Sequence, residues 1–340
     1  MRVGIIGGGF GLHVQAPLVN LHPNMNVTAV STMNRHELPA KLIRDDHSSL
    51  HYKDWNRMLD REELDLLFVS SMPIYHFEMV KKAIEMRIPV VCEKPFTMNS
   101  KESIELLQLS KKYNTKVLID FEWRYLPVRQ KMKEMISNKE IGEIIHTEYH
   151  VTSPMYQSLH SAKRGWMGKR QFFGGMLGAV GTHMLDCVRW LTEDEVETIS
   201  GLTSTHIPEG AEEHRDADDA FFIHGTMKRR STFSLQVITG IQHGFGSSLK
   251  VYGSLGTITL TNDKTLCAAK ANETFAEVEV PVKEIPYALS GEAARYYAAF
   301  YPFLEKIYEY VAEDHLHKDL PTVEDAHANQ LILDKILKLG

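Results

Sequence analysis

The sequence predicts an α/β protein in which a doubly wound parallel sheet domain is followed by an α+β domain with a mainly antiparallel sheet. Three observations predict this fold class. A glycine-rich turn directly follows the first apolar strand, apolar runs then alternate with amphipathic helical stretches up to about residue 120, and the later strands show period-two alternation. A chain of 340 residues suits two domains of ordinary size, which we place at 1–121 and 122–340.

Short apolar runs are the expected strands of the parallel sheet. They are Val3–Ile6, Val27–Val30, Leu64–Ser70, Val90–Cys92 and Val117–Ile119. The stretches His76–Arg87 and Ser100–Tyr113 have the pattern of crossover helices. Asn99 can cap the second of these helices, with Glu102 placed three residues later to reach back.

After Phe121 the pattern changes to that of an α+β domain. We expect helices near 128–136, 175–191, 292–311 and 324–339. A period-two strand should place Ile145, Thr147, Tyr149 and Val151 on one face. Further strands are expected at Phe221–Thr226, Phe233–Thr239, Leu249–Tyr252 and Thr257–Thr261, with the last two joined across residues 253–256.

Composition and charge exclude several classes of function. The net charge is -6, from 44 acidic and 38 basic side chains, and no basic stripe suggests nucleic acid as a partner. Cys92, Cys187 and Cys267 lie far apart and predict neither a disulfide framework nor a CxxC metal site. We find no signal peptide and no apolar run of membrane-spanning length, so we expect a cytoplasmic protein without a membrane partner.

The segment Gly7-Gly8-Gly9-Phe10-Gly11-Leu12 lies between the first strand and a helical pattern, which is the setting of a dinucleotide-binding turn. We therefore predict that Gly7, Gly9, Phe10 and Gly11 contact a cofactor, with the helix amino end facing its phosphates. Leu12 occupies the position of the third glycine, and Gly11 is expected to provide the close packing of helix on strand. The alternative is a purely structural turn.

The end of the second strand indicates which nicotinamide cofactor is bound. An acidic residue that would hold the ribose of NAD is missing, and the chain has Ser31, Thr32, Asn34 and Arg35 there instead. Hydroxyl, amide and guanidinium groups suit a 2′-phosphate, so NADP is slightly preferred over NAD. The alternative is that Arg35 begins a solvated helix and NAD binds without its usual acid.

Two further segments should reach the carboxyl edge of the sheet, where such folds bind ligands. Ser71, Pro73 and His76 follow the strand Leu64–Ser70 and are candidates for the nicotinamide side, although His76 equally suits the start of a helix. Glu93 and Lys94 follow Val90–Cys92, and Pro95 favours an extended backbone at Lys94. A lysine in such a loop is most often simply solvated.

These motifs together resemble the Gfo/Idh/MocA oxidoreductases over nearly the whole chain. The resemblance rests on the glycine turn, Ser71-Met72-Pro73 with His76, Glu93-Lys94-Pro95, the stretch 123–127, and Gly174-Gly175 followed by Gly181, His183 and Asp186. It implies a Rossmann domain followed by an α+β domain with an open sheet that often serves oligomer contacts, here in a dimer or tetramer. It also implies NAD(P)-linked oxidation or reduction of a sugar, inositol or related polyol.

By this resemblance Lys94 matches the catalytic lysine of the family and His183 its catalytic histidine. The chain departs from the pattern at Ala179, where many relatives have an aspartate four residues before the histidine. At helical spacing Ala179, His183 and Asp186 share one face. Asp186 is thus a candidate for orienting His183 at the substrate, or else it is a buried capping carboxylate.

The expected reaction removes a hydride and a hydroxyl proton from a secondary alcohol. His183 is our first choice as general base, because imidazole titrates near neutral pH. Lys94 is assigned chiefly to a hydrogen bond with the reacting oxygen, although the two could exchange roles. Trp123, Arg124, Tyr156 and Trp166 are candidates for the substrate wall, with core packing as the commoner role of such aromatics.

Three other functions were weighed. The 17 histidines do not supply a recognisable metal site, and residues 214–219 are more simply a charged loop entering a strand. An NAD-dependent glycosidase that recycles its hydride is an alternative enzyme. The third function is a non-catalytic sensor of nicotinamide or sugar levels. The presence of Lys94 and His183 disfavours this function, whereas Ala179 weakly favours it.

Overall fold

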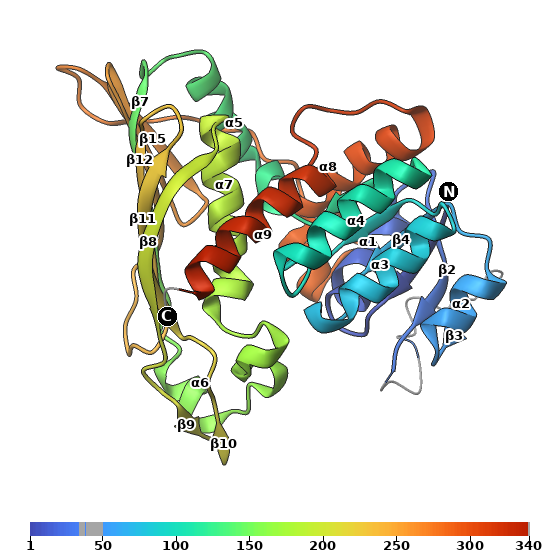
Figure 1. Cartoon of the computed structure of the whole chain (residues 1–340). Helices are drawn as coiled ribbons and strands as arrows, with labels where there is room; N and C mark the ends of the chain where they lie inside the picture. Colours follow the sequence, from blue (N-terminus) through green and yellow to red (C-terminus); the bar gives the residue numbers. More distant parts are fainter. Residues whose placement is uncertain (34–37, 39–49, 339–340) are drawn as a thin grey trace. The chain divides into compact units, whose positions relative to one another are not determined.

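The computed structural model shown in Figure 1 describes residues 1–33, 38 and 50–338. The chain forms two compact units. One comprises Met1–Tyr125 and Val282–His327, and the other comprises Leu126–Pro281 and Ala328–Gly340. This division corrects our expectation that everything after residue 121 belongs to the second domain.

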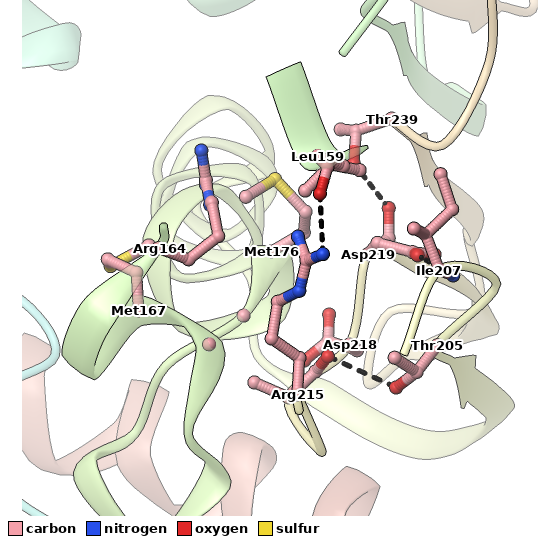
Figure 2. A pocket seen from close by; sticks show the side chains of 13 residues that line it. Leu159, Arg164, Met167, Met176, Thr205, Ile207, Arg215, Asp218, Asp219 and Thr239 are labelled. Atoms are coloured by element: carbon pink, nitrogen blue, oxygen red, sulfur yellow. Dashed lines mark hydrogen bonds between the residues drawn. The ribbon is translucent and has the colours of Figure 1, made fainter. Parts of the chain in front are cut away.

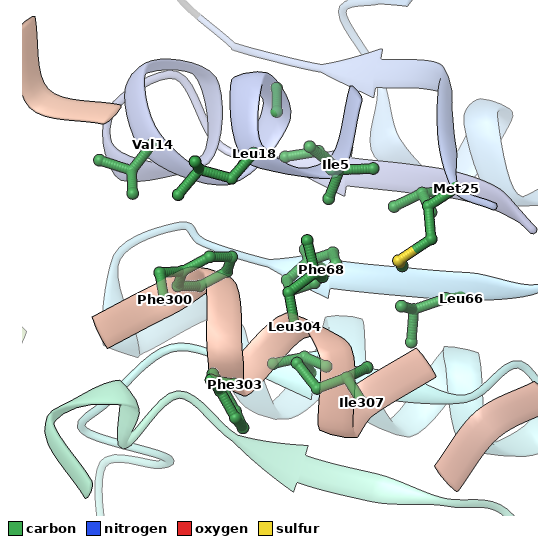
Figure 3. Close-up of a cluster of buried hydrophobic side chains, with 14 of the residues drawn as sticks. Ile5, Val14, Leu18, Met25, Leu66, Phe68, Phe300, Phe303, Leu304 and Ile307 are labelled. Atoms are coloured by element: carbon green, nitrogen blue, oxygen red, sulfur yellow. The ribbon is translucent and has the colours of Figure 1, made fainter. Parts of the chain in front are cut away.

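The reason for the correction is the long helix α8 (Gly291–Glu313). Its buried residues Phe300, Phe303, Leu304 and Ile307 lie in one hydrophobic cluster with residues of the parallel sheet, as Figure 3 shows. Burial of this apolar face stabilises the packing of α8 on the first unit. The helix therefore belongs to the first unit, although it follows the second unit in the sequence.

The first unit is built on a parallel sheet with strand order β3-β2-β1-β4-β5-β6 among the described residues. The strands are β1 (Arg2–Ile6), β2 (Asn26–Ser31), β3 (Leu50–Tyr52), β4 (Leu66–Val69), β5 (Val90–Cys92) and β6 (Val117–Ile119). All expected strands are confirmed within two residues, and the short β3 was not expected. The order reverses between β1 and β4, and this switch point is where doubly wound sheets bind ligands.

Helices cover both faces of this sheet. They are η1 (Gly11–Gln15), α1 (Ala16–Leu21), α2 (Trp55–Arg61), η3 (Pro73–Tyr75), α3 (His76–Glu85), α4 (Ser100–Tyr113) and η4 (Glu122–Tyr125). Alternation along the strands divides the core, since Ile5 and Phe68 belong to one cluster while Ile6 and Val69 belong to the other. The predicted cap of α4 is confirmed, because Asn99 Oδ1 accepts hydrogen bonds from the amides of residues 101 and 102 at 3.1 Å.

The second unit contains a sheet with strand order β16-β15-β14-β13-β7-β12-β11-β8 in the described part of the chain. Its neighbouring strands are antiparallel except for the parallel pair of β7 and β12. The strands are β7 (Ile144–Thr152), β8 (Val196–Ser204), β11 (Ala220–Met227), β12 (Thr232–Ile238), β13 (Gly246–Gly253), β14 (Gly256–Thr261), β15 (Thr265–Lys270) and β16 (Ala276–Glu277). The expected mainly antiparallel sheet is therefore confirmed.

One face of this sheet is covered by α5 (Pro127–Ser137) and α7 (Thr182–Thr192), as Figure 1 shows. On β7 the predicted face points toward these helices, and Thr147 and Tyr149 are buried there. The other face of the same strand carries partly exposed polar residues such as His146 and Glu148. The remaining elements of the unit are α6 (Tyr156–Ser161), η5 (Gly165–Gly168), η6 (Arg170–Phe172), η7 (Leu177–Gly181), β9 (Glu209–Gly210), β10 (Glu213–His214) and most of α9 (Val323–Leu337).

No helix among residues 1–33 and 50–338 combines the length and apolar character that crossing a bilayer requires. The three cysteines are free thiols, with Cys92 and Cys187 buried.

Candidate functional site

The turn after β1 has the geometry that a dinucleotide phosphate requires. Gly7 has φ +144°, and a Cβ atom there would lie 2.2 Å from the carbonyl oxygen of Ser70, so only glycine fits. A Cβ at Gly9 would meet nothing within 4 Å. The backbone at Gly9 is therefore open to a ligand, while the carbonyl oxygen of this residue accepts hydrogen bonds from Leu12 and His13.

Gly11 has the packing role expected of the missing third glycine. A Cβ at this position would lie 2.8 Å from Ile5 Cγ2 and 3.3 Å from Ser70 Cβ, so the helix approaches the sheet through glycine. The helix begins with the π-helical turn η1, which accommodates the earlier placement of this glycine. Phe10 is half-buried and packs edge-on against Tyr296 at 5.0 Å between ring centroids. Its role in the structure is hydrophobic packing, and its contact with a cofactor stays a prediction.

At the end of β2, Ser31 and Thr32 are both buried. The carbonyl oxygen of Ser31 accepts a hydrogen bond from Gly7 N at 2.9 Å, which ties the second strand to the glycine turn. Thr32 Oγ1 lies 2.7 Å from His51 Nε2. His51 was not recognised from the sequence, because its contact depends on the unexpected strand β3. Asn34 and Arg35 lie outside the described residues.

The loop after β4 is fixed to the loop after β5 by His76. This side chain is fully buried, and its ring nitrogens Nδ1 and Nε2 lie 2.9 Å from Pro95 O and 3.0 Å from Ser71 O. Burial lowers the pKa of His76. In the structure His76 supports the two loops from beneath, and its predicted contact with a cofactor stays a prediction. Pro73 is buried as well, and Ser71 remains half-exposed.

Lys94 follows β5 at the carboxyl edge of the parallel sheet, as predicted, and its side chain is partly exposed. The peptide bond between Lys94 and Pro95 is cis. Buried acids lie near this lysine, since the charge of Lys94 acts on both Glu93 and Glu122. Sequence reasoning recognised Glu93 but missed Glu122 and Asp120. A usable signal was present, because positions 120 and 122 directly follow β6 and so reach the same edge.

In the second unit, His183 lies on α7 and is 3% exposed, and Asp186 on the same helix is 2% exposed. The helix is preceded by the π-helical turn η7, which contains Ala179. A π-helical turn winds more widely than an α-helix, so the α-helical spacing that we used between Ala179 and His183 does not hold there. His183 and Asp186 both lie in the regular part.

Asp218 fixes the start of this helical segment and was missed by sequence reasoning. Its Oδ2 atom accepts a hydrogen bond from Leu177 N at 2.8 Å, and its carbonyl oxygen accepts one from Met176 N at 3.0 Å. Burial raises the pKa of Asp218 to about 6. The neighbouring acids Asp216 and Asp219 also accept backbone N–H groups, at Arg170 and Ile207. The carboxylates in the stretch 214–219 thus fix the backbone of neighbouring segments by accepting hydrogen bonds from their N–H groups.

Figure 2 shows a small cavity beside this framework, about 20 Å³ in volume. Arg215 is buried, lines this cavity and donates a hydrogen bond to the carbonyl oxygen of Leu159. The space accommodates about one water molecule, which suits a solvated guanidinium better than a sugar. None of the substrate-wall candidates lines it, although Met167 and Gly175 come from the same segment as Trp166.

The four substrate-wall candidates differ in environment. Arg124 is buried, donates to Asp319 O at 3.1 Å and pairs with Asp325 at 3.3 Å within the first unit, and its contact with substrate stays a prediction. Trp123, Tyr156 and Trp166 are half-buried. Tyr156 packs against His160 with 4.5 Å between ring centroids. For these three, substrate contact stays a prediction.

In the described part of the chain, the ligand atoms of Glu309, His315 and His317 come within 4.8 Å of one another, as in a metal site. Both carboxylate oxygens of Glu309 already accept hydrogen bonds from Lys306, at 2.9 and 3.1 Å, and the group also contacts His317. This arrangement is a complete ion-pair network at the end of α8, so we assign no metal to it.

Comparison with known proteins places this geometry in a family. A model of an oxidoreductase family with an NAD-binding Rossmann fold matches residues 1–121, and a model of the Gfo/Idh/MocA C-terminal domain matches residues 129–259. The chain belongs to the Gfo/Idh/MocA oxidoreductase family. It is accordingly a dehydrogenase or reductase with an NAD-binding domain, as the sequence predicted.

Other Gfo/Idh/MocA proteins are similar over most of the chain. An uncharacterized oxidoreductase from Synechocystis sp. is 26% identical over 273 residues, which cover 77% of this chain and 72% of that protein. Glucose-6-phosphate 3-dehydrogenase from Bacillus subtilis is 23% identical over 259 residues, covering 74% and 72%. Levoglucosan dehydrogenase, solved with NADH and levoglucosan, shares the fold with a TM-score of 0.85 at 21% identity and covers 100% of this chain and 96% of its own.

Proposed function

We propose that this oxidoreductase transfers hydride between a nicotinamide cofactor and a secondary alcohol or ketone of a sugar, inositol or related polyol. The observation that carries the proposal is the position of Lys94, one residue beyond Glu93 at the carboxyl end of β5, on the same sheet edge as the open turn at Gly9. Relatives named for glucose 6-phosphate and levoglucosan support the choice of a polyhydroxylated substrate.

The residues of the first unit fit a dinucleotide. The open backbone at Gly9 and the close packing at Gly11 leave the amino end of η1 accessible to a pyrophosphate. When bound, the nicotinamide supplies the carbon that accepts or returns the hydride. We propose that Ser31, Thr32, Asn34 and Arg35 face the adenosine ribose and favour NADP over NAD.

We propose that Lys94 and His183 carry the proton chemistry. His183 acts as general base in oxidation and general acid in reduction, and Asp186 is its orienting carboxylate. Lys94 donates a hydrogen bond to the reacting oxygen and steadies the negative charge that develops there. Trp123, Tyr156 and Trp166 offer aromatic faces to the sugar ring.

The first test is binding and turnover with defined probes. Fluorescence titration with NADH and NADPH measures the cofactor preference, and tighter binding of NADH by about tenfold or more would overturn the preference for NADP. Turnover is then measured with levoglucosan, myo-inositol and glucose 6-phosphate. The variant Lys94→Ala should lose at least about 100-fold in kcat while it still binds cofactor, and near-normal turnover would remove the lysine from the mechanism.

We also propose a reducing cytoplasm as the working compartment, which the free cysteines favour. We further propose, as the first point to test, a dimer or tetramer formed through the face of the eight-stranded sheet that α5 and α7 leave uncovered. Light scattering on the purified protein tests the first point. A monomer at micromolar concentration would contradict it.

A further inference from the structure

A cluster of three acidic side chains lies beside Lys94 within the first unit. Glu93 follows β5, while Asp120 and Glu122 follow β6, and these two strands are parallel neighbours. Asp120 is fully buried and Glu122 is 4% exposed, whereas Glu93 is partly exposed. Acids buried this deeply in one place require either cations or protons to balance them.

Backbone N–H groups of residues 94 and 122 serve Glu93 and Glu122, and one side-chain amide is shared between two of the acids. Gln15 Nε2 lies 2.9 Å from Asp120 Oδ2 and 3.3 Å from Glu93 Oε1, so one amide group serves two acids. Ser70 donates to the Oε1 atom of the same glutamine, which fixes the amide with its NH₂ group toward the carboxyl groups. Among the described residues, the second oxygen of Asp120 meets no N–H or hydroxyl donor.

The acids contact one another instead. Glu93 and Asp120 are in hydrogen-bond contact, and so are Asp120 and Glu122. Two carboxylates cannot hydrogen-bond, because both are acceptors, and the contact becomes a hydrogen bond only when one of the pair carries a proton. Together with the single amide of Gln15 that serves both Asp120 and Glu93, these contacts favour at least one proton held along the row from Glu93 through Asp120 to Glu122.

The pKa values of the three acids also favour bound protons. Burial, followed by repulsion between the acids, raises the pKa of Glu93 and Asp120 well above the usual range and raises the pKa of Glu122 to about 8. The charge of Lys94 lowers the pKa of Glu93 and Glu122 in return. The other titratable groups that face the cluster are Cys92 on β5 and Tyr296 on α8, and the pKa of each is raised by burial and by these acids.

We propose that Glu93, Asp120 and Glu122 form a shared proton store for Lys94. The store itself follows from the geometry, and its use in catalysis rests on the proposed function. This use takes the alternative in which Lys94 and His183 exchange roles: in oxidation the hydroxyl proton passes to Lys94 Nζ while the ammonium gives another proton to Glu93 or Glu122. Lys94 thus keeps its charge and the cluster gains one proton, which the partly exposed Glu93 can release to water. Reduction runs the same transfers in reverse.

The store can be tested without any substrate. Infrared titration of the purified protein follows the C=O stretching band of protonated carboxyl groups, and we expect this band at neutral pH with a decrease as the pH rises through about 8, where Glu122 loses its proton. Glu122→Gln and Asp120→Asn should remove or shift the band, whereas Glu85→Gln, at an exposed acid on α3, should leave it unchanged. A native protein without the band at neutral pH would overturn the store.

A separate variant tests whether the charge of Lys94 acts on the protonation of the three acids. Replacement by methionine removes a positive charge that lowers the pKa of Glu93 and Glu122, so the band of Lys94→Met should persist to a higher pH than that of the native protein. The matched control is Lys81→Met, because Lys81 pairs with Glu105 at 2.8 Å on the helices α3 and α4. An unchanged titration in Lys94→Met would overturn the link between Lys94 and the acids.

The catalytic use is tested on whichever of the three sugar probes the native protein turns over. Glu122→Gln should lower kcat by about tenfold or more with little change in KM, and it should alter the pH profile of kcat, with partial rescue by Glu122→Asp. A native pH profile and native kcat in Glu122→Gln would overturn this use. Normal turnover of Lys94→Ala would instead contradict the proposed function. The infrared titration would still decide whether the three acids hold a proton, because it needs no substrate.

Discussion

His76 joins two loops of the first unit through its imidazole ring, whose Nδ1 atom lies 2.9 Å from the carbonyl oxygen of Pro95. The other ring nitrogen faces Ser71 O at 3.0 Å. Pro95 directly follows Lys94, so the buried ring supports the backbone that carries the lysine. A histidine at the start of α3 therefore affects the candidate site from beneath it.

We expect His76 to make the first unit sensitive to acid. Burial lowers the pKa of His76 below the unfolded value of about 6.5, so the folded state binds fewer protons than the unfolded state. The contribution to stability is present above that pH and is lost as the pH falls. His76→Gln cannot gain a charge, and its melting temperature should fall less than that of the native protein between pH 7.5 and pH 5.5. Equal losses in both proteins would contradict this prediction.

The glycine turn offers a matched pair of substitutions. Gly7→Ala places a Cβ against Ser70 O at 2.2 Å and strains a residue with φ +144°, so it should lower the melting temperature by several degrees or prevent folding. Gly9→Ala meets no protein atom within 4 Å and should fold normally. If the backbone at Gly9 faces the pyrophosphate, the second variant should bind NADPH about tenfold more weakly or worse. Native affinity in Gly9→Ala would place the phosphates elsewhere.

The sequence was sufficient for elements whose pattern is local. Apart from β3, the strands of the parallel sheet depend on neighbouring residues, as do the Asn99 cap and the turn at Gly7, and each of these is where the pattern predicts it. The sequence was insufficient for α8, because the choice between two cores depends on which apolar surface Phe300 and Leu304 meet in three dimensions. Helix periodicity shows that a face is buried but does not show against what.

The same distinction applies to the candidate site. Lys94 and Glu93 were found because they form a recognisable tripeptide with Pro95. Asp120, Glu122 and Gln15 come from separate segments and become a cluster only through strand order, with Gln15 and Asp120 105 positions apart in the chain. The sequence did not predict that Arg124 donates to the carbonyl oxygen of Asp319, because the two residues lie far apart in the chain and meet only in the folded unit.

Buried Arg129 and partly exposed Asp263 form an ion pair that should contribute strongly to the stability of the second unit. Arg129 on α5 is fully buried, and its Nε and Nη2 atoms lie 2.7 and 3.0 Å from the two oxygens of Asp263. Asp263→Ala leaves a buried charge without this carboxylate, which typically costs about 3–5 kcal/mol. The double variant Arg129→Met with Asp263→Ala removes the charge as well and should recover part of the loss. Melting temperatures of the three proteins test this, and a double variant less stable than Asp263→Ala alone would contradict it.

Asp218 should have two effects. It should make the stability of the second unit depend on pH, and through its hydrogen bond to Leu177 it should position the helix that carries His183. Its folded pKa is raised from 3.8 to about 6, so its contribution to stability is fully present below the lower value and is lost as the pH rises through the higher one. Asp218→Asn keeps an oxygen acceptor for Leu177 N and carries no charge. The melting temperature of this variant, relative to the native protein, should therefore rise between pH 4 and pH 7.

Asp218→Ala separates the second effect from the first. It removes the 2.8 Å hydrogen bond that fixes the turn η7 ahead of His183, so kcat should fall by about tenfold while NADPH binding stays unchanged. Asp218→Asn should keep most of the activity because its amide oxygen can replace the carboxylate as acceptor. If both variants lose the same activity, the charge of Asp218 and not its hydrogen bond to Leu177 is what the reaction requires.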